Sequence, residues 1–311
     1  KWEYYIESED TNEVNPNLKP EDITVLDPAM WSWHILVYAF EVLFDIYKSA
    51  WYTNDEIPKL IIENNLFWLE IDNRAYQIAC FAIIMKARKY DKKILKEIKN
   101  NNLKINAFSI SETQNCDVID ELLYPNLAQL CTKFKQASLI WSLITIKNFD
   151  EEKINEEFEA FQKEWTIFNS KLIQLLPKII NQARLLHSKY SCVVSNPPYM
   201  GWKYMNKELW DYVKKNFPDT KSDLFAVFME RNFEFTKSDW MLWFMTPFVW
   251  MFINAYKNIR ENIIENKTIS SLIQLEYNAF ENACIPICTF TIRNYKSCIK
   301  WDYIKLSDFK W

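Results

Sequence analysis

Residues 27–34 read Asp-Pro-Ala-Met-Trp-Ser-Trp-His, and they join the apolar run ITVLDPAM (23–30) to a segment with apolar residues at helical spacing, Ile35 to Tyr47. An apolar run that ends in Asp-Pro is typical of a buried strand that enters a turn. A strand, a tight turn and a helix in this order form the first half of a βαβ unit. The stretch therefore predicts a parallel sheet with a turn at the carboxyl end of its first strand.

The same alternation continues along the chain. A strand is predicted at LFWLEID (66–72), a helix from about Arg74 to Lys89, and a strand at INAFSIS (105–111). Beyond a long charged segment, the apolar runs predict further strands at 191–199, 241–247, 268–276 and 286–294, and a helix at 223–235. Strands and helices that alternate in this way form an open sheet covered on both faces. We therefore predict an α/β fold with a Rossmann-like sheet, helices on both faces and a helical insertion.

Composition limits the classes of function. The net charge is −4, so no basic field indicates a nucleic-acid partner. Seven cysteines without a CxxC pair favour free thiols in a reducing compartment over a zinc site. No apolar run reaches the length of about 20 residues that spans a bilayer. We expect a cytoplasmic protein with no membrane partner and no metal.

Glycine is almost absent. The chain has one glycine, Gly201, and 14 tryptophans, whereas average usage predicts about 22 glycines in this length. Turns and helix C-caps need residues that tolerate positive φ. We infer that another residue has replaced the glycines.

Three segments follow predicted parallel strands, at the edge where open α/β sheets bind ligands. With glycine at positions 31 and 33, residues 27–34 become a turn whose bare backbone and helix N-terminus suit a ligand. Glu70 and Asp72 end the second strand, where an acidic side chain commonly binds ribose hydroxyls. A solvated carboxylate is the alternative interpretation of these two residues.

The third segment is Ser195-Asn196-Pro197-Pro198-Tyr199. Two prolines hold the backbone extended after the strand, so that the Asn196 side-chain oxygen and the Pro197 carbonyl can converge on one point. Two acceptors at one point suit an exocyclic NH2 group, and Tyr199 offers a ring on which a base can stack. The alternative is a rigid surface turn.

Together these segments resemble the class I methyltransferases, and within them the DNA adenine-N6 enzymes of the gamma motif order. The stretches NPPYMGWKYMN, KSDLFAVFMERN, MTPFVWMF and SLIQLEYNAFENACIPICTF are similar to the PglX family of BREX phage-defence methylases and to the type IIG methylase-restriction fusions. The resemblance covers nearly the whole chain except the insertion. It implies site-specific methylation of adenine N6 in double-stranded DNA, with S-adenosyl-L-methionine (AdoMet) as cofactor and other defence-system subunits as further partners.

The resemblance also implies roles for individual residues. Asp27 would lie near the amino group of AdoMet, Glu70 would bind its ribose, and Ile71 would pack on its adenine, with Glu112 close by. The rest of the predicted cofactor loop is Pro28, Ala29, Trp31, Trp33 and His34. The predicted catalytic residues, which would hold a flipped adenine, are Asn196, Pro197, Pro198 and Tyr199. The transfer is direct and needs neither a metal nor a nucleophilic cysteine.

The resemblance divides the chain into five segments. Residues 1–22 form an irregular lead-in, 23–112 the AdoMet-binding half, 113–187 the helical insertion, 188–295 the catalytic half, and 296–311 the start of a linker to a target-recognition domain. We expect both ends of the chain to be truncated.

The chain departs from the family pattern at its tryptophans. Ten stand where the pattern prefers glycine: Trp31, Trp33, Trp51, Trp68, Trp141, Trp202, Trp240, Trp243, Trp301 and Trp311. Our hypothesis is that UGA codons meaning glycine in the source organism were translated as tryptophan; pseudogene decay is the rival. Indoles at Trp31 and Trp33 would fill the cofactor site and strain a positive-φ backbone there, so the chain as written is predicted not to bind AdoMet.

Two other functions stay open. If the tryptophans are real, the chain is a catalytically dead methylase fold kept as a scaffold. The Asn-Pro-Pro-Tyr sequence also serves protein methylases that modify a glutamine side-chain amide, because that amide is an NH2 group too. Methyl acceptance by DNA or by a glutamine-bearing protein separates the two enzymes.

Overall fold

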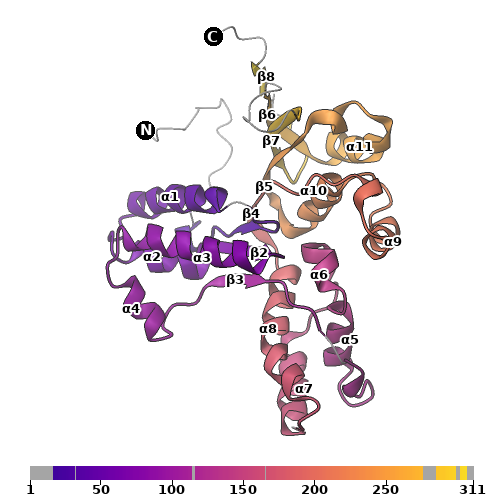
Figure 1. The fold of residues 1–311 in the computed structure, drawn as a ribbon. Coiled ribbons are helices and arrows are strands. Elements are labelled where there is room, and N and C mark those ends of the chain that lie inside the picture. The colour runs from indigo at the N-terminus through magenta and orange to yellow at the C-terminus, as the bar shows by residue number, and fades with distance from the viewer. Residues whose placement is uncertain are drawn as a thin grey trace.

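A computed structural model of the chain describes residues 17–31, 33–113, 116–164, 166–275, 285–298 and 302–306 (Figure 1). Trp301 and Trp311, two of the predicted glycine positions, lie outside the described residues, as does most of the predicted lead-in. Within the described part of the chain, no helix is both long enough and apolar enough to cross a membrane.

One sheet organises the described residues, and its strands run in the order β3-β2-β1-β4-β5-β7-β6-β8. The strands are β1 (Val25–Asp27), β2 (Leu66–Glu70), β3 (Asn106–Ser109), β4 (Tyr190–Ser195), β5 (Thr236–Pro247), β6 (Thr268–Gln274), β7 (Ile287–Arg293) and β8 (Asp302–Lys305). All neighbouring strands are parallel except that β7 is antiparallel to both β5 and β6. The predicted α/β, Rossmann-like sheet is confirmed. The edge strand β8 was not predicted, because its four residues fall in the segment that we assigned to a linker.

The helices follow the predicted alternation. They are α1 (His34–Ser49), α2 (Ile57–Leu60), α3 (Asn73–Arg88), α4 (Ile94–Lys99), α5 (Pro125–Lys133), α6 (Ala137–Ile140), α7 (Glu151–Lys163), α8 (Ser170–His187), α9 (Lys207–Asn216), α10 (Leu224–Phe235) and α11 (Lys257–Asn266). Helices α5, α7 and α8 extend away from the sheet as an arm (Figure 1). The charged stretch between β3 and β4 is therefore helical, as its periodicity predicted.

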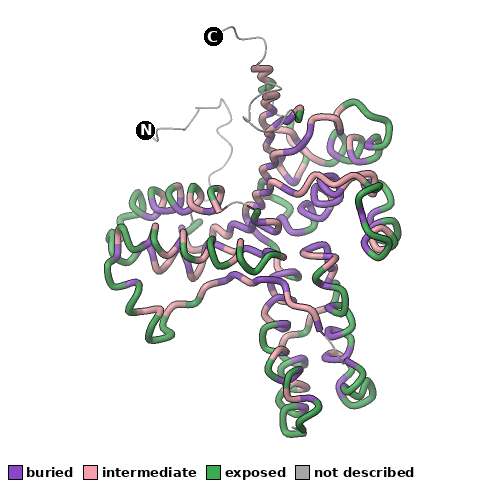
Figure 2. The backbone as a smooth tube through the Cα atoms, viewed as in Figure 1, coloured by how far each residue is buried: buried purple, intermediate pink, exposed green. Residues whose placement is uncertain are grey.

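Alternate residues of the strands build a core on each face of the sheet. Val25 and Trp68 are buried in one cluster with side chains of α1 and α3, whereas Leu26 and Leu69 are buried in another with α8 and α10. Successive side chains of a strand point to opposite faces of the sheet, so the two clusters lie on opposite faces. Helices therefore cover both faces of the sheet. Figure 2 shows the strands of the sheet as mostly buried and the outer sides of the helices as exposed.

The end of α1 requires a residue with positive φ. The amide of Tyr52 donates to the carbonyl of Tyr47 at 3.2 Å, and the amide of Trp51 donates to the carbonyl of Lys48 at 3.2 Å. This pair of bonds is the Schellman motif, whose C′ residue is usually glycine. Trp51 occupies that C′ position with a φ of 69°.

Positive φ identifies a second predicted glycine position. Among the described non-glycine residues, φ is positive at Trp51, Asn101 and Trp141. Trp141 has φ 58° and ψ −145°, close to a region that essentially only glycine adopts. The strain predicted at residues 31 and 33 was wrong, because neither has positive φ. Trp33 precedes α1 and has nearly helical backbone angles, φ −57° and ψ −9°.

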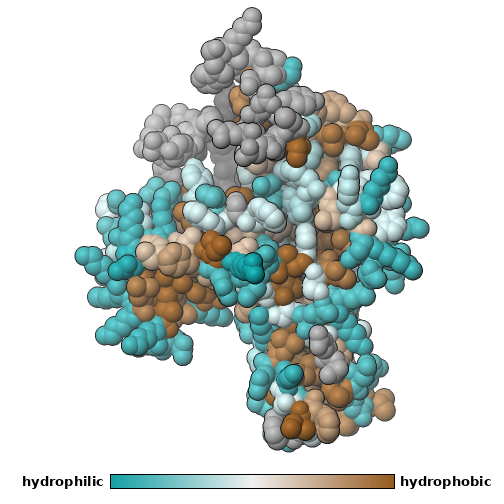
Figure 3. Space-filling view, viewed as in Figure 1, coloured by the Kyte–Doolittle hydropathy of each residue, from teal (hydrophilic) through white to brown (hydrophobic). Residues whose placement is uncertain are grey.

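Helix α3 has apolar side chains on two faces. Ala79 and Ile83 are buried against the sheet, while Ile78, Phe81 and Met85 are exposed on the outer face. Figure 3 shows a brown, hydrophobic area over the region of α3 and α4. This surface is open in the described structure.

Candidate active site

A cleft lies at the carboxyl ends of β1, β2 and β4. Its volume is about 390 Å³, within the range of small-molecule sites. Nine of the thirteen predicted site residues line it: Pro28, Ala29, Trp31, Glu70, Ile71, Asn196, Pro197, Pro198 and Tyr199. Because β1 pairs with both β2 and β4, the sheet order brings together three segments that are far apart in the sequence.

The loop after β1 forms one wall of the cleft. Asp27 is buried below it, and its Oδ1 accepts a hydrogen bond from the amide of Ala29 at 3.2 Å. Burial, together with the nearby charge of Glu70, raises the pKa of Asp27 to about 8. The indole of Trp31 is 80% exposed and borders the opening of the cleft. The loop therefore offers a buried acidic group beneath backbone that a ligand can approach.

Glu70 ends β2 in a fixed orientation. Its Oε1 accepts hydrogen bonds from the amides of Ile71 and Asp72, both at 2.9 Å. Burial is the largest cause that raises the pKa of Glu70. The side chain of Ile71 also lines the cleft. An oriented carboxyl group beside an apolar surface suits a ligand with hydroxyl groups and a flat ring.

The segment after β4 forms the opposite wall. The hydroxyl of Tyr199 lies 2.9 Å from Oδ1 of Asn196 and 3.2 Å from the carbonyl oxygen of Met245, so it can donate to one of them at a time. The ring of Tyr199 packs edge-on against Phe225, with 6.4 Å between the centroids. Burial raises the pKa of Tyr199, which keeps the hydroxyl protonated as a donor. When the hydroxyl donates to Oδ1 of Asn196, the shorter of the two contacts, it orients the Asn196 side chain at the cleft.

Four predicted site residues do not line the cleft. Asp27 lies beneath it, whereas Trp33 and His34 stack on each other at the start of α1, with 4.0 Å between their rings. His34 instead lines a second, apolar groove between α1 and the sheet. Glu112 accepts a hydrogen bond from Ser138 and lies away from the cleft. The sequence placed these residues near the turns, but it could not show to which side they point.

Four residues of the cleft were not predicted: Leu69, Ile110, Trp141 and Ile285. Leu69 and Ile110 stand near strand ends, which was the signal that could have identified them. Trp141 comes from the segment between β3 and β4, and its only signal was its place among the suspected glycine positions. Ile285 follows residues 276–284, which the structure does not describe.

Comparison with known proteins identifies the family. The profile described as Eco57I restriction-modification methylase matches residues 64–280. The chain belongs to this family. The match includes β2, the arm and the Asn196–Tyr199 segment, so it covers most of the cleft.

Two curated relatives extend the similarity to nearly the whole chain. The adenine-specific methyltransferase BrxX of Escherichia coli O9:H4 (strain HS) is 35% identical over 321 residues, and the adenine-specific methyltransferase PglX of Lacticaseibacillus casei (strain Zhang) is 35% identical over 299. Each alignment covers 90% of this chain, but only 26% and 24% of the respective relative. The chain thus spans about a quarter of their length, and the predicted resemblance to the PglX family is confirmed.

Solved structures support the fold. A nuclease-deletion mutant of the Type ISP restriction-modification enzyme LlaGI, in complex with a DNA substrate mimic, matches 92% of this chain and 22% of its own, with a TM-score of 0.54 and 11% identity. The DrdV–DNA complex matches 91% of this chain and 24% of its own, with a TM-score of 0.52 and 12% identity. At these identities the similarity establishes the architecture alone.

Proposed function

We propose that the chain is the core of a site-specific DNA adenine-N6 methyltransferase of a phage-defence system. The observation that carries the proposal is the single cleft that joins the 27–31 loop, Glu70 and the Asn196–Tyr199 segment. Such a cleft can hold a cofactor and an NH2-bearing base next to each other. The names of the two curated relatives, both adenine-specific methyltransferases, agree with it.

The residues of the cleft fit AdoMet. Asp27 supplies a buried acidic group for the cofactor's amino group, and Glu70 supplies a hydrogen-bonding carboxyl group for the ribose hydroxyls. Ile71 offers an apolar surface for the adenine ring. When bound, AdoMet supplies the methyl group that is transferred. Ionised Asp27 pairs with a cationic amino group, so that the cofactor offsets the cost of charge at this buried site.

The opposite wall would position the target. A stacked adenine hides N6 from an active site, so the base must flip out of the duplex. Oδ1 of Asn196 and the carbonyl of Pro197 would accept the two N6 hydrogens and so hold the nitrogen lone pair toward the bound cofactor. The cofactor would supply the methyl group and leave as S-adenosylhomocysteine, and one N6 proton would be released. Stacking on Tyr199 contributes about 1–3 kcal/mol. Holding both reactants in line can contribute about 7–11 kcal/mol.

The remaining assignments are part of the same proposal. Residues 23–112 and 188–295 form the cofactor-binding and catalytic halves, and 113–187 is an insertion between them. Double-stranded DNA is the substrate, and subunits of a BREX or restriction-modification system are further partners.

A methyl-transfer assay tests the proposal. A form with glycine at positions 31, 33, 51 and 141 is incubated with labelled AdoMet and either duplex DNA or a glutamine-bearing release factor. We expect N6-methyladenine in the DNA, no label in the protein, and no product from the same form carrying Asn196→Ala. Label in the protein alone would favour the glutamine methylase. AdoMet binding without transfer to either acceptor would favour a scaffold.

A further inference from the structure

The segment between β3 and β4 contributes one turn to the cleft. The turn consists of Trp141–Leu143, a single 3-10 turn that follows α6, and the next residue, Ile144. Trp141 lines the cleft together with Pro28 and Asn196. The hydroxyl of Ser142 donates to the carbonyl of Pro28, so the turn lies directly against the loop after β1.

The turn is fixed from behind by buried polar groups. Arg231 of α10 is only 4% exposed, and it donates to the carbonyls of Ser142 at 3.3 Å and Ile144 at 2.9 Å. The hydroxyl of Tyr212 donates to the carbonyl of Leu143 at 3.0 Å. Three successive carbonyls of the turn are therefore held by side chains of α9 and α10. A buried guanidinium with several acceptors fixes geometry because its donors form a rigid fork.

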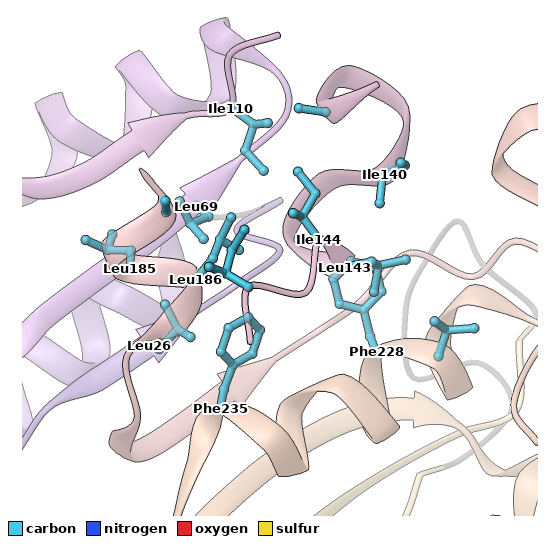
Figure 4. Close-up of a cluster of buried hydrophobic side chains, with 14 of the residues drawn as sticks. Leu26, Leu69, Ile110, Ile140, Leu143, Ile144, Leu185, Leu186, Phe228 and Phe235 are labelled. Atoms are coloured by element: carbon cyan, nitrogen blue, oxygen red, sulfur yellow. The ribbon is translucent and has the colours of Figure 1, made fainter. Parts of the chain in front are cut away.

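Apolar packing adds to this anchoring. Figure 4 shows Leu143 and Ile144 reaching into the cluster that contains Phe228, Phe235 and Leu186. Arg231 also donates to the carbonyl of Leu186 at 3.0 Å. The turn thus cannot move away from the cleft without breaking both the hydrogen bonds and the core, so the side chain at residue 141 has little room to withdraw.

The backbone of residue 141 suits a residue without a side chain. Its φ of 58° and ψ of −145° lie near the region that essentially only glycine populates. The Trp141 indole packs against Phe228, with 5.8 Å between the rings, and borders the cleft. We propose that this turn forms part of the wall of the cofactor site, beside the loop after β1, that Arg231 positions it, and that residue 141 sets the space available to the cofactor. This inference rests on the proposed function.

Binding of S-adenosylhomocysteine, measured by calorimetry, tests the inference. All forms carry Trp31→Gly and Trp33→Gly, so that the loop after β1 is the same in each. The addition of Trp141→Gly is expected to tighten binding by about tenfold or more. Trp51→Gly is the matched control, because it also relieves a positive-φ tryptophan but lies at the end of α1, away from the cleft. It is expected to raise the melting temperature without changing affinity.

The outcomes separate this inference from the proposed function. If every form binds and Trp141→Gly changes affinity no more than Trp51→Gly does, or weakens it, the inference is overturned while the cofactor site stands. If no form binds, including one with glycine at all four positions, the cleft is not a cofactor site and both proposals fall.

The role of Arg231 has its own readout. Arg231→Lys keeps the charge but loses the fork that reaches several carbonyls. We expect about tenfold weaker binding at a temperature where circular dichroism shows the variant fully folded. A lower melting temperature with unchanged affinity would mean that Arg231 stabilises the fold without positioning the wall.

Discussion

The end of α1 offers a direct test of glycine at a tryptophan position. Trp51→Gly changes the C′ residue of a Schellman motif whose φ is 69°. The left-handed conformation costs an L-residue roughly 1–2 kcal/mol. Glycine also has more conformational freedom in the unfolded chain, which lowers the stability of the glycine variant by about 0.4–1 kcal/mol. The indole is 94% exposed, so its removal sacrifices almost no buried area.

These contributions predict that Trp51→Gly raises the free energy of unfolding by up to about 1.6 kcal/mol, with about 0.8 kcal/mol at the middle of the range. Trp51→Ala is the matched control, since alanine also lacks the indole but bears the same left-handed strain; it should leave stability nearly unchanged. Urea unfolding measures both, and the glycine variant should shift the midpoint without a change in slope. Equal stability of the glycine and alanine variants would refute the assignment of strain to this position.

Three further predictions concern the cleft and its support. Tyr199→Phe keeps the ring but removes the hydroxyl that orients Asn196. Loss of this hydrogen bond, worth about 1 kcal/mol, should lower kcat about fivefold in the methyl-transfer assay. An unchanged kcat would contradict the orienting role of the hydroxyl. The pKa of Asp27 is raised from 3.8 to about 8, so between these two pH values the folded chain binds more protons than the unfolded chain. The free energy of unfolding therefore falls as the pH rises through this range, by at most about 1.4 kcal/mol per pH unit. Asp27→Asn should flatten this part of a stability-versus-pH curve, and an unaltered slope would argue against a buried neutral carboxyl. Asp72 caps α3 by accepting from the amides of Arg74 and Ala75; Asp72→Ala should cost about 1 kcal/mol in urea unfolding, whereas Asp72→Asn should cost much less.

Much of the fold could be predicted because the strands have strong local signals. The apolar runs before Asp27, Glu70 and Asn196 each became a parallel strand of the sheet. Parallel strands are buried on both faces, so they are nearly continuous apolar runs in the sequence. The residues that follow these three strands form the three predicted segments of the cleft.

The rest depended on tertiary packing. The place of Trp141 in the cleft is set by hydrogen bonds from Arg231 and Tyr212, which come about 70 to 90 residues later in the chain. The direction of His34 depends on how α1 lies on the sheet, and no local pattern encodes it. Likewise, positive φ distinguishes Trp51 and Trp141 from the other described tryptophans only once the backbone is known.

The structure of the form with glycine at positions 31, 33, 51 and 141, solved with S-adenosylhomocysteine, tests the account most directly. We predict that the ligand lies in the cleft with its ribose on Glu70, its amino group above Asp27, and its sulfur facing Asn196. A ligand bound in any other place, or with its sulfur turned away from Asn196, would contradict the assignment of this cleft as the methyl-transfer site.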